Sequence, residues 1–293
     1  MNFKLKGIAR DDAAYIAEWT FHHLYFGFDE LELLVINSSD STLTIIQKIA
    51  QVFPQVKIVL QDSLLHKPNS TFEFARTCNA GYSLQLNVDE FWVPADFKSS
   101  VRELIPHKIE PHALKLPCFQ ALENDAFAIL RQRIYLKPVS HQLGIIFERS
   151  GCTIPAFILR RNMRSEIEYL ASKHDSFSNY RVFLSEHHDG YQRSSSDTLE
   201  MEFGEAAHSK YIDAYYGFLT LTGIKPLIKR ARLEVFERSQ QTIQQIMRLS
   251  KLIGEDEKCV LLNLFSGIED KSLKQALAKL DANTFRESIK TSA

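Results

Sequence analysis

The sequence lacks the marks of several large classes of protein. Its four cysteines are scattered through 293 residues without a Cys-X-X-Cys pair, so neither a zinc knuckle nor a disulfide framework is suggested. No stretch approaches the roughly 18 apolar residues of a membrane-spanning helix, and no apolar segment follows the first lysines as in a signal peptide. Basic and acidic residues balance at 35 and 36, which gives no reason to expect nucleic acid as a partner. We therefore expect reduced thiols and a cytoplasmic location.

Glycine-rich phosphate-binding loops are missing as well. The first expected strand is not followed by Gly-X-Gly-X-X-Gly, and Gly-X-X-X-X-Gly-Lys-Ser occurs nowhere in the chain. This argues against a nicotinamide-dependent dehydrogenase and against a P-loop enzyme. A bound diphosphate would then need a metal ion, in place of the loop, to neutralise its charge.

What the sequence does contain is a regular alternation of strand and helix patterns near its N-terminus. Strands are expected at 3–9, 31–36, 56–60 and 82–86, with helices at 13–26, 43–53 and 71–80 between them. Strands separated by helices of this length pair in parallel through right-handed crossovers. The expected fold is therefore α/β, with an open, doubly wound, mostly parallel sheet flanked by helices. A hydrophobic content of 45% is enough to bury such a core.

The C-terminal part has a wholly helical pattern, with helices expected at 206–221, 225–249 and 273–278. We expect a catalytic domain at 1–200 and a helical C-terminal region at 201–293. Basic and apolar residues alternate on the long helix, which fits an anionic membrane, reached from its inner face, or packing on the catalytic domain or a second subunit of a homodimer. Packing on protein is the plainer interpretation because acidic residues dilute the positive charge. The apolar residues expected to face this partner surface are Leu227, Ile228, Leu233, Phe236, Ile243 and Ile246.

Polar and acidic residues follow each expected strand at the point where it ends. In an open parallel sheet the ligand binds beyond these carboxyl ends, so these segments are expected to line the site. Helix capping accounts for Asp11. It does not account for Asp89 and Glu90, which lead into an apolar run, and carboxylates at the edge of a core need a cation. The segments are Arg10-Asp11-Asp12, Asn37-Ser38-Ser39-Asp40, Gln61-Asp62 and Asn87-Val88-Asp89-Glu90.

Carboxylates with few other functional groups are typical of a divalent-metal site. Mg²⁺ and Mn²⁺ take hard oxygen ligands, often only one or two carboxylates, and complete their shell with water and substrate phosphates. The sequence therefore predicts Mn²⁺ or Mg²⁺ as the cofactor, with a diphosphate compound as the ligand that completes the site.

These segments resemble the family-2-like glycosyltransferases. Residues 8–19, with a Glu-Trp pair, and 22–29, with a histidine and Gly-Phe-Asp, are similar to the opening of that family. Residues 37–41 are similar to its Asp-Asn-X-Ser-X-Asp loop, and 87–91 to its Asp-X-Asp-Glu-Phe metal motif. The resemblance covers about the first third of the chain. It implies a GT-A fold and an inverting transfer of sugar from a nucleotide-diphosphate sugar to a glycan or lipid-linked acceptor.

The resemblance also implies roles for individual residues. Asp12 and Asp40 would contact the base and ribose, Asp89 would bind the metal, and Asn87 would meet the ribose or the metal. Ile36 and Asn87 stand where the family has aspartates, so weaker metal affinity is expected. Arg76 would approach the diphosphate or be an ordinary solvated arginine. The expected nucleotide-sugar set is Arg10, Asp12, Asp40, Asp62, Arg76, Asn87 and Val88, and the expected metal set is Asp89, Asn87 and His188.

The middle of the chain would supply the acceptor side and the catalytic base. Glu123 and Asp125 are the candidates, because an inverting transferase needs a carboxylate to take the proton of the acceptor hydroxyl, but both also fit a surface loop. Imidazoles stand beside carboxylates at 174–175 and 187–189, and by resemblance a late histidine would be an extra metal ligand. The arginine pairs at 131 and 133 and at 160–161 would grip an anion or carry plain surface charge.

Three interpretations of function stay open. The first is an active, metal-dependent glycosyltransferase. The second is a degenerate relative that binds a nucleotide or glycan without turnover, which Ile36 and Asn87 favour. The third is a nucleotidyltransferase on a similar sheet, which ranks last because the glycine-rich loop expected after its first strand is absent.

Overall fold

The computed structural model describes residues 2–61, 73–76, 81–105, 114–122, 125–139, 156–162, 165–185, 190–191, 198–249, 252–265, 267–271, 273–275 and 277–278. They group into two compact units. The first comprises Met1–Ala121, Ala128–Asn162 and Ser196–Arg232, and the second Leu122–Phe127, Met163–Ser195 and Leu233–Ala293. The domain boundary at residue 200 that the helical pattern predicts stays a prediction.

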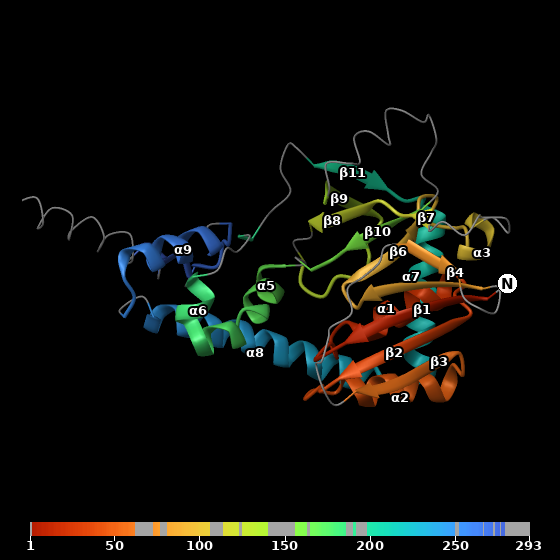
Figure 1. Ribbon diagram of the computed structural model, residues 1–293, viewed down its shortest axis with the longest axis horizontal. Coiled ribbons are helices and arrows are strands. Elements are labelled where there is room, and N and C mark those ends of the chain that lie inside the picture. Colours follow the sequence, from red (N-terminus) through yellow and green to blue (C-terminus); the bar gives the residue numbers. More distant parts are fainter. Residues whose placement is uncertain are drawn as a thin grey trace, which may run out of the picture. The chain divides into compact units, whose positions relative to one another are not determined.

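The first unit contains the expected parallel sheet. Its strands lie in the order β3-β2-β1-β5-β4-β7, and β3, β2, β1 and β5 are all parallel (Figure 1). The four strands expected near the N-terminus are confirmed, and the α/β class with them. Their bounds are β1 Phe3–Ala9, β2 Glu30–Ile36, β3 Val56–Gln61 and β5 Tyr82–Asn87, followed in the sheet by β4 Glu73–Arg76 and β7 Leu114–Lys115.

The helix expected at 71–80 is wrong where the structure describes it. Residues 73–76 form β4, which pairs antiparallel with both β5 and β7. The sequence Glu-Phe-Ala-Arg is too short to separate a period of two from one turn of helix, so pairing with neighbouring strands decides its state. The rest of the expected helix lies outside the described residues.

Helices pack on this sheet as a connected group. The main helices of the first unit are α1 Ile16–Tyr25, α2 Thr42–Val52 and α7 Glu205–Thr222, with the short α3 at Val101–Leu104. α1 contacts α2 and α7, and α2 contacts α7. Because β1, β2 and β3 follow one direction across the sheet, two right-handed crossovers place α1 and α2 on the same face. Glycine is needed at Gly7 of β1, since a Cβ there would come within 2.5 Å of the Trp19 ring.

A second sheet completes the first unit. Its strand order is β11-β9-β8-β10-β6, and β6 pairs antiparallel with β10. β6 follows β5 after a two-residue turn, so this turn joins the two sheets. The strands are β6 Glu90–Pro94, β8 Cys118–Leu122, β9 Arg133–Pro138, β10 Ala156–Arg160 and β11 Leu199–Glu202. Aromatic rings of α1, α7 and the residues that follow α1, β6 and β11 pack together, namely Phe21, Phe26, Phe97, Phe203 and Tyr211.

The second unit is helical in its described part. It contains α5 Glu166–Ser172, the 3-10 helix η1 Asp175–Asn179, α6 Tyr180–Ser185 and α9 Glu255–Phe265, together with α8 Lys225–Leu249 from residue 233 onward. The helices expected at 206–221 and 225–249 are confirmed, and residues 273–275 and 277–278 are helical. Among the helices that the structure describes, none has the length and apolar character needed to cross a membrane.

The buried face expected for α8 is confirmed only in part. Ile228, Ile243 and Ile246 are buried. Leu233 and Phe236 are instead 56% and 45% exposed, so the described chain does not bury them, and a second subunit or a membrane as the surface that they face stays a prediction. Leu233 lies five residues after Ile228, which is about 140° of helix rotation, so it faces another side of α8. Phe236 lies seven residues before the buried Ile243, on nearly the same side of the helix, so helix periodicity does not account for its exposure.

Candidate functional site

The parallel sheet brings together the polar segments that follow three of its strands. Because β2, β1 and β5 are parallel neighbours, their carboxyl ends meet at one edge, which carries residues 37–40, 10–12 and 87–90. β3 ends beside them at Gln61, and Asp62 lies outside the described residues. We call this edge the strand-end rim.

Asp11 links the loops that follow β1 and β2. Its Oδ1 accepts hydrogen bonds from the Ser39 amide at 2.6 Å, the Ser39 hydroxyl at 3.0 Å and the Asp40 amide at 3.3 Å. The Asp11 amide donates to the Ser38 hydroxyl at 3.1 Å. Asp11 and Asn37 both have positive φ, at 54° and 41°. Non-glycine residues in this conformation are uncommon and cluster at functional sites, and both lie at the rim.

Asp12 and Asp40 are oriented by bonds to the backbone. Asp12 Oδ2 accepts from the Arg10 amide at 2.8 Å. Asp40 accepts from the Ala13 amide at 2.9 Å and from the Thr42 amide at 2.9 Å, so it ties the chain before α1 to the start of α2. A carboxylate has about four lone-pair positions, so these bonds fix the direction of each group and leave capacity for a ligand.

Glu90 forms an ion pair in the protein interior. Its carboxylate is 1% exposed, and Oε1 accepts from Arg160 Nε at 3.2 Å and Nη2 at 3.0 Å. Oε2 accepts a hydrogen bond from the backbone N–H of Asn87 at 2.9 Å. Burial lowers the pKa of Arg160, but the bond to Glu90 and its charge outweigh burial and raise that pKa above its ordinary value. The cation that the buried acid requires is therefore an arginine.

Asn87, Val88 and Asp89 form the turn between the two sheets. The Asp89 carbonyl accepts from the Arg161 amide at 2.7 Å, and the Val88 side chain is buried. The Asn87 and Asp89 side chains are half-buried at the rim. In the described part of the chain, no three His, Cys, Asp or Glu side chains gather to hold a metal by themselves. One carboxylate and one amide oxygen still fit Mg²⁺ or Mn²⁺, which leave several positions to water and substrate phosphates.

Other residues of the expected site lie elsewhere or outside the described chain. Arg76 pairs in register with Tyr82, the first residue of β5, which is roughly 16 Å along the strand from Asn87. It also stands on a strand and not on the expected helix. Asp125 is exposed and belongs to the second unit. The remaining three, Asp62, Glu123 and His188, lie outside the described residues.

The cationic residues expected to grip an anion have protein partners. Arg133 on β9 pairs with Glu200 at 3.0 Å and with Glu202 at 3.1 Å. Arg160 pairs with Glu90, and Arg131 is exposed. His174 pairs with its neighbour Asp175 at 2.8 Å in the second unit.

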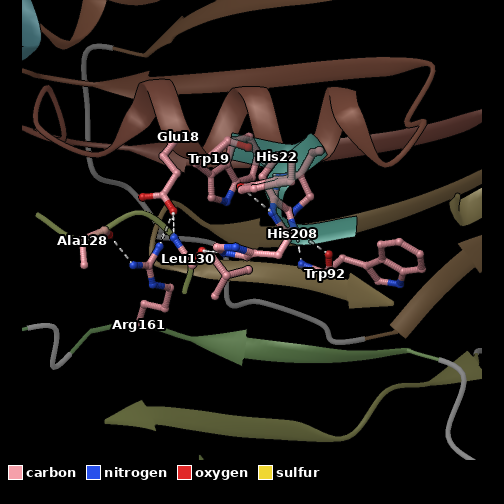
Figure 2. A network of polar contacts seen from close by, with 10 residues as sticks. Glu18, Trp19, His22, Trp92, Ala128, Leu130, Arg161 and His208 are labelled. Atoms are coloured by element: carbon pink, nitrogen blue, oxygen red, sulfur yellow. Dashed lines mark hydrogen bonds and ion pairs between the residues drawn. The ribbon is translucent and has the colours of Figure 1, made fainter. Parts of the chain in front are cut away.

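A buried polar network beneath the rim was missed from the sequence. Arg161 Nη1 contacts Glu18 Oε1 at 2.5 Å, and its Nη2 donates to the Ala128 carbonyl at 2.6 Å (Figure 2). The same Glu18 oxygen accepts from the Leu130 amide at 2.8 Å, whose carbonyl accepts from His208 at 2.8 Å. The signal available in the sequence was Glu18 itself, an acid between the apolar residues Ala17 and Trp19 of an expected helix.

Two neighbouring histidines of α1 are neutral structural groups. His22 Nε2 donates to the Trp92 carbonyl at 2.8 Å, so its Nδ1 accepts from the Tyr211 hydroxyl at 3.1 Å. His23 Nδ1 donates to the Trp19 carbonyl, and its Nε2 accepts from the Trp92 amide. Burial lowers the pKa of His22 to about 4 and that of His23 well below its ordinary value. Both fix α1 against β6.

Comparison with known proteins adds no family to this geometry. No protein-family profile matches the chain, and no curated protein matches it by sequence. The functional argument therefore rests on the rim and on the segments that form it.

Proposed function

We propose that the protein is a metal-dependent glycosyltransferase with a GT-A fold, which moves a sugar from a nucleotide-diphosphate sugar to a glycan or lipid-linked acceptor. The observation that carries the proposal is the position of Asp89 and Asn87. They lie on a turn at the carboxyl end of a central parallel strand, beside the loops after β1 and β2. Open parallel sheets bind nucleotides at such an edge.

Mn²⁺ or Mg²⁺ would be held by Asp89, with the Asn87 amide oxygen as a second ligand. When bound, the metal neutralises the diphosphate that leaves with the nucleotide. The chain itself would orient the nucleotide through the loops that Asp11 ties together, with Arg10, Asp12 and Asp40 at their surface. Glu123 and Asp125, the candidates from the sequence for the base that takes the acceptor proton, belong to the second unit and stay predictions.

A second candidate function is binding without turnover. The Ile36 side chain is 1% exposed, at the position where the resemblance implies an aspartate. A buried isoleucine makes no polar contact with a nucleotide. Asn87 also lacks the charge of the aspartate that it replaces. These two positions favour a degenerate protein that keeps the nucleotide site but not the catalytic rate.

The proposal is tested by titration calorimetry of UDP, GDP and their sugar conjugates, with and without Mn²⁺. We expect one nucleotide to bind only when metal is present, and Asp89→Ala to abolish that binding. Asp213→Ala is the matched control, because Asp213 is an exposed acid on α7 away from the strand ends. Binding that is independent of metal and of Asp89 would refute the proposal.

Turnover separates the two candidate functions. A transferase usually hydrolyses its donor slowly when water takes the place of the acceptor, so release of nucleotide from the bound sugar conjugate is measured. Release that depends on Mn²⁺ and is lost in Asp89→Ala supports the enzyme. Metal-dependent binding with no release, even with glycan acceptors added, supports the degenerate binding protein.

A further inference from the structure

Two consecutive arginines at the end of β10 contact the turn between the two sheets. Arg160 is paired in register with Glu90 across the antiparallel β6–β10 ladder, and its guanidinium binds the Glu90 carboxylate. The Arg161 amide donates to the Asp89 carbonyl at 2.7 Å. One arginine therefore holds the turn by its side chain and the next holds it by its backbone.

The Glu90 carboxylate links Arg160 to Asn87, the first residue of the turn. One of its oxygens accepts from Arg160, and the other accepts from the Asn87 amide at 2.9 Å. The turn is thus fixed at the amide of Asn87, the carbonyl of Asp89 and the side chain of Glu90. Since Glu90 is 1% exposed and bound in this way, it is an internal support of the turn and not a ligand presented at the rim.

Arg161 is itself fixed by the core. Its side chain is 0% exposed and contacts Glu18 of α1 and the Ala128 carbonyl. Its guanidinium also lies over the ring of Phe91, 5.2 Å from the centroid. Contacts from a helix, a loop and a strand leave its backbone little freedom, so the amide that binds Asp89 is held by three separate parts of the first unit.

We propose that Arg160 and Arg161 are positioning residues, which fix the Asn87–Glu90 turn so that Asp89 and Asn87 are preorganised for a divalent metal. Both act through the turn, Arg160 through the Glu90 carboxylate and Arg161 through the Asp89 carbonyl. The metal part of this inference rests on the proposed function, whereas the order of the turn is a property of the chain and is tested separately. Outer contacts that orient a metal ligand commonly change metal affinity by about 10- to 100-fold when they are removed.

The experiment compares Arg160→Met, Arg160→Lys and the double variant Glu90→Gln/Arg160→Met with the wild type. The double variant matters because it leaves no unpaired buried charge, so it is expected to fold even where Arg160→Met does not. Arg133→Met is the matched control, since it removes an arginine from β9 of the same sheet whose ion pairs are on the surface. Folding of each variant is checked by its thermal unfolding midpoint.

Two quantities are measured on the full chain. The first is hydrogen exchange of the Asn87 amide without ligand, which we expect to be faster in Arg160→Met and in the double variant. The second is Mn²⁺ affinity from water proton relaxation, with MnCl₂ alone and with UDP or GDP. We expect about 10- to 100-fold weaker Mn²⁺ binding in the two methionine variants and partial recovery in Arg160→Lys, because lysine keeps the charge but not the two-nitrogen contact.

The outcomes separate this inference from the proposed function. If a folded double variant binds Mn²⁺ with nucleotide as tightly as the wild type does, the arginine does not position the metal ligand and the inference fails. If the wild type fails to bind Mn²⁺ in the presence of UDP and also in the presence of GDP, the proposed function fails. The hydrogen-exchange measurement still decides whether Arg160 orders the turn. Unchanged protection of the Asn87 amide in the folded double variant overturns the inference in either case.

Discussion

The buried ion pair between Glu18 and Arg161 gives a sharp test of how the first unit is held together. The two side chains are 4% and 0% exposed. Replacing Arg161 by methionine keeps an unbranched side chain but removes its charge. The Glu18 carboxylate then stays buried without its cation, although the Leu130 amide still donates to it. The carbonyl of Ala128 loses the guanidinium as a donor.

The expected loss follows from the cost of an uncompensated buried charge. Removing one partner of a buried pair costs about 3–5 kcal/mol, whereas replacing both partners costs much less. Arg161→Met should therefore lower the free energy of unfolding by about 3–5 kcal/mol. The double variant Glu18→Gln/Arg161→Met should lose only about 1–2 kcal/mol, which corresponds to the donor lost at the Ala128 carbonyl.

Urea denaturation followed by tryptophan fluorescence measures this difference. The chain has two tryptophans, and both Trp19 and Trp92 are buried in the first unit, so the signal reports that unit. Arg133→Met is the control and should leave the midpoint unchanged, because exposed ion pairs contribute little. The reasoning is refuted if Arg161→Met unfolds at the wild-type midpoint, or if the double variant is as unstable as the single one.

Further predictions concern the packing, titration and loop geometry of the first unit. Gly7→Ala should lower stability by about 1–3 kcal/mol in thermal unfolding, because its methyl would meet an indole ring 2.5 Å away, whereas Gly217→Ala, on an open helix face, should raise it by about 0.5–1 kcal/mol. The pKa of His22 is lowered from 6.5 to about 4 by burial, so below pH 6.5 the unfolded chain takes up a proton more readily than the folded one. The free energy of unfolding should therefore be unaffected by this group above pH 6.5 and fall by about 3 kcal/mol as pH falls to about 4. His22→Gln should flatten that loss in urea titrations at several pH values, and His174→Gln should not. Asp11→Ala should lower the melting temperature and nucleotide affinity, whereas Asp11→Asn should keep both, because asparagine tolerates a φ of 54° and retains the accepting oxygen; equal losses in both variants would contradict this.

The parallel sheet could be predicted because its signals are local. β2 is a short, mostly apolar run, β1 and β5 alternate apolar and polar residues, and β3 is rich in β-branched residues, while α1 and α2 are bounded by turn-forming residues. The carboxyl ends then follow from parallel pairing alone. Those rules placed residues 10–12, 37–40 and 87–90 at one edge before any contact was known.

The second sheet could not be predicted in the same way. β6 is buried at all five positions and β10 at four of five, so neither shows the alternation of a half-buried strand. Their pairing joins residues about seventy positions apart, as between Glu90 and Arg160, and nothing local specifies such a partner. The strand at 73–76 was missed for the same reason, since its state depends on β5 and β7.

The acidic pair Asp89-Glu90 shows that neighbouring acids in a sequence can have different roles. The acids paired inside the protein must be separated from those that face a ligand before a metal site is inferred. From the sequence, both acids at the edge of the core were expected to need a cation, and only Asp89 of the two was placed in the expected metal set. The turn separates them: Glu90 begins the buried strand β6 and meets Arg160, while Asp89 stays half-buried at the rim. Arg160 neutralises Glu90, and position 87 carries the amide side chain of an asparagine. The turn therefore presents a single carboxylate, that of Asp89, at the rim. For a divalent ion held there, the phosphates of the nucleotide would supply most of the negative charge that surrounds the metal. Metal and nucleotide should therefore bind together, each weakly without the other, and this coupling is what titration of Mn²⁺ in the presence and absence of nucleotide measures.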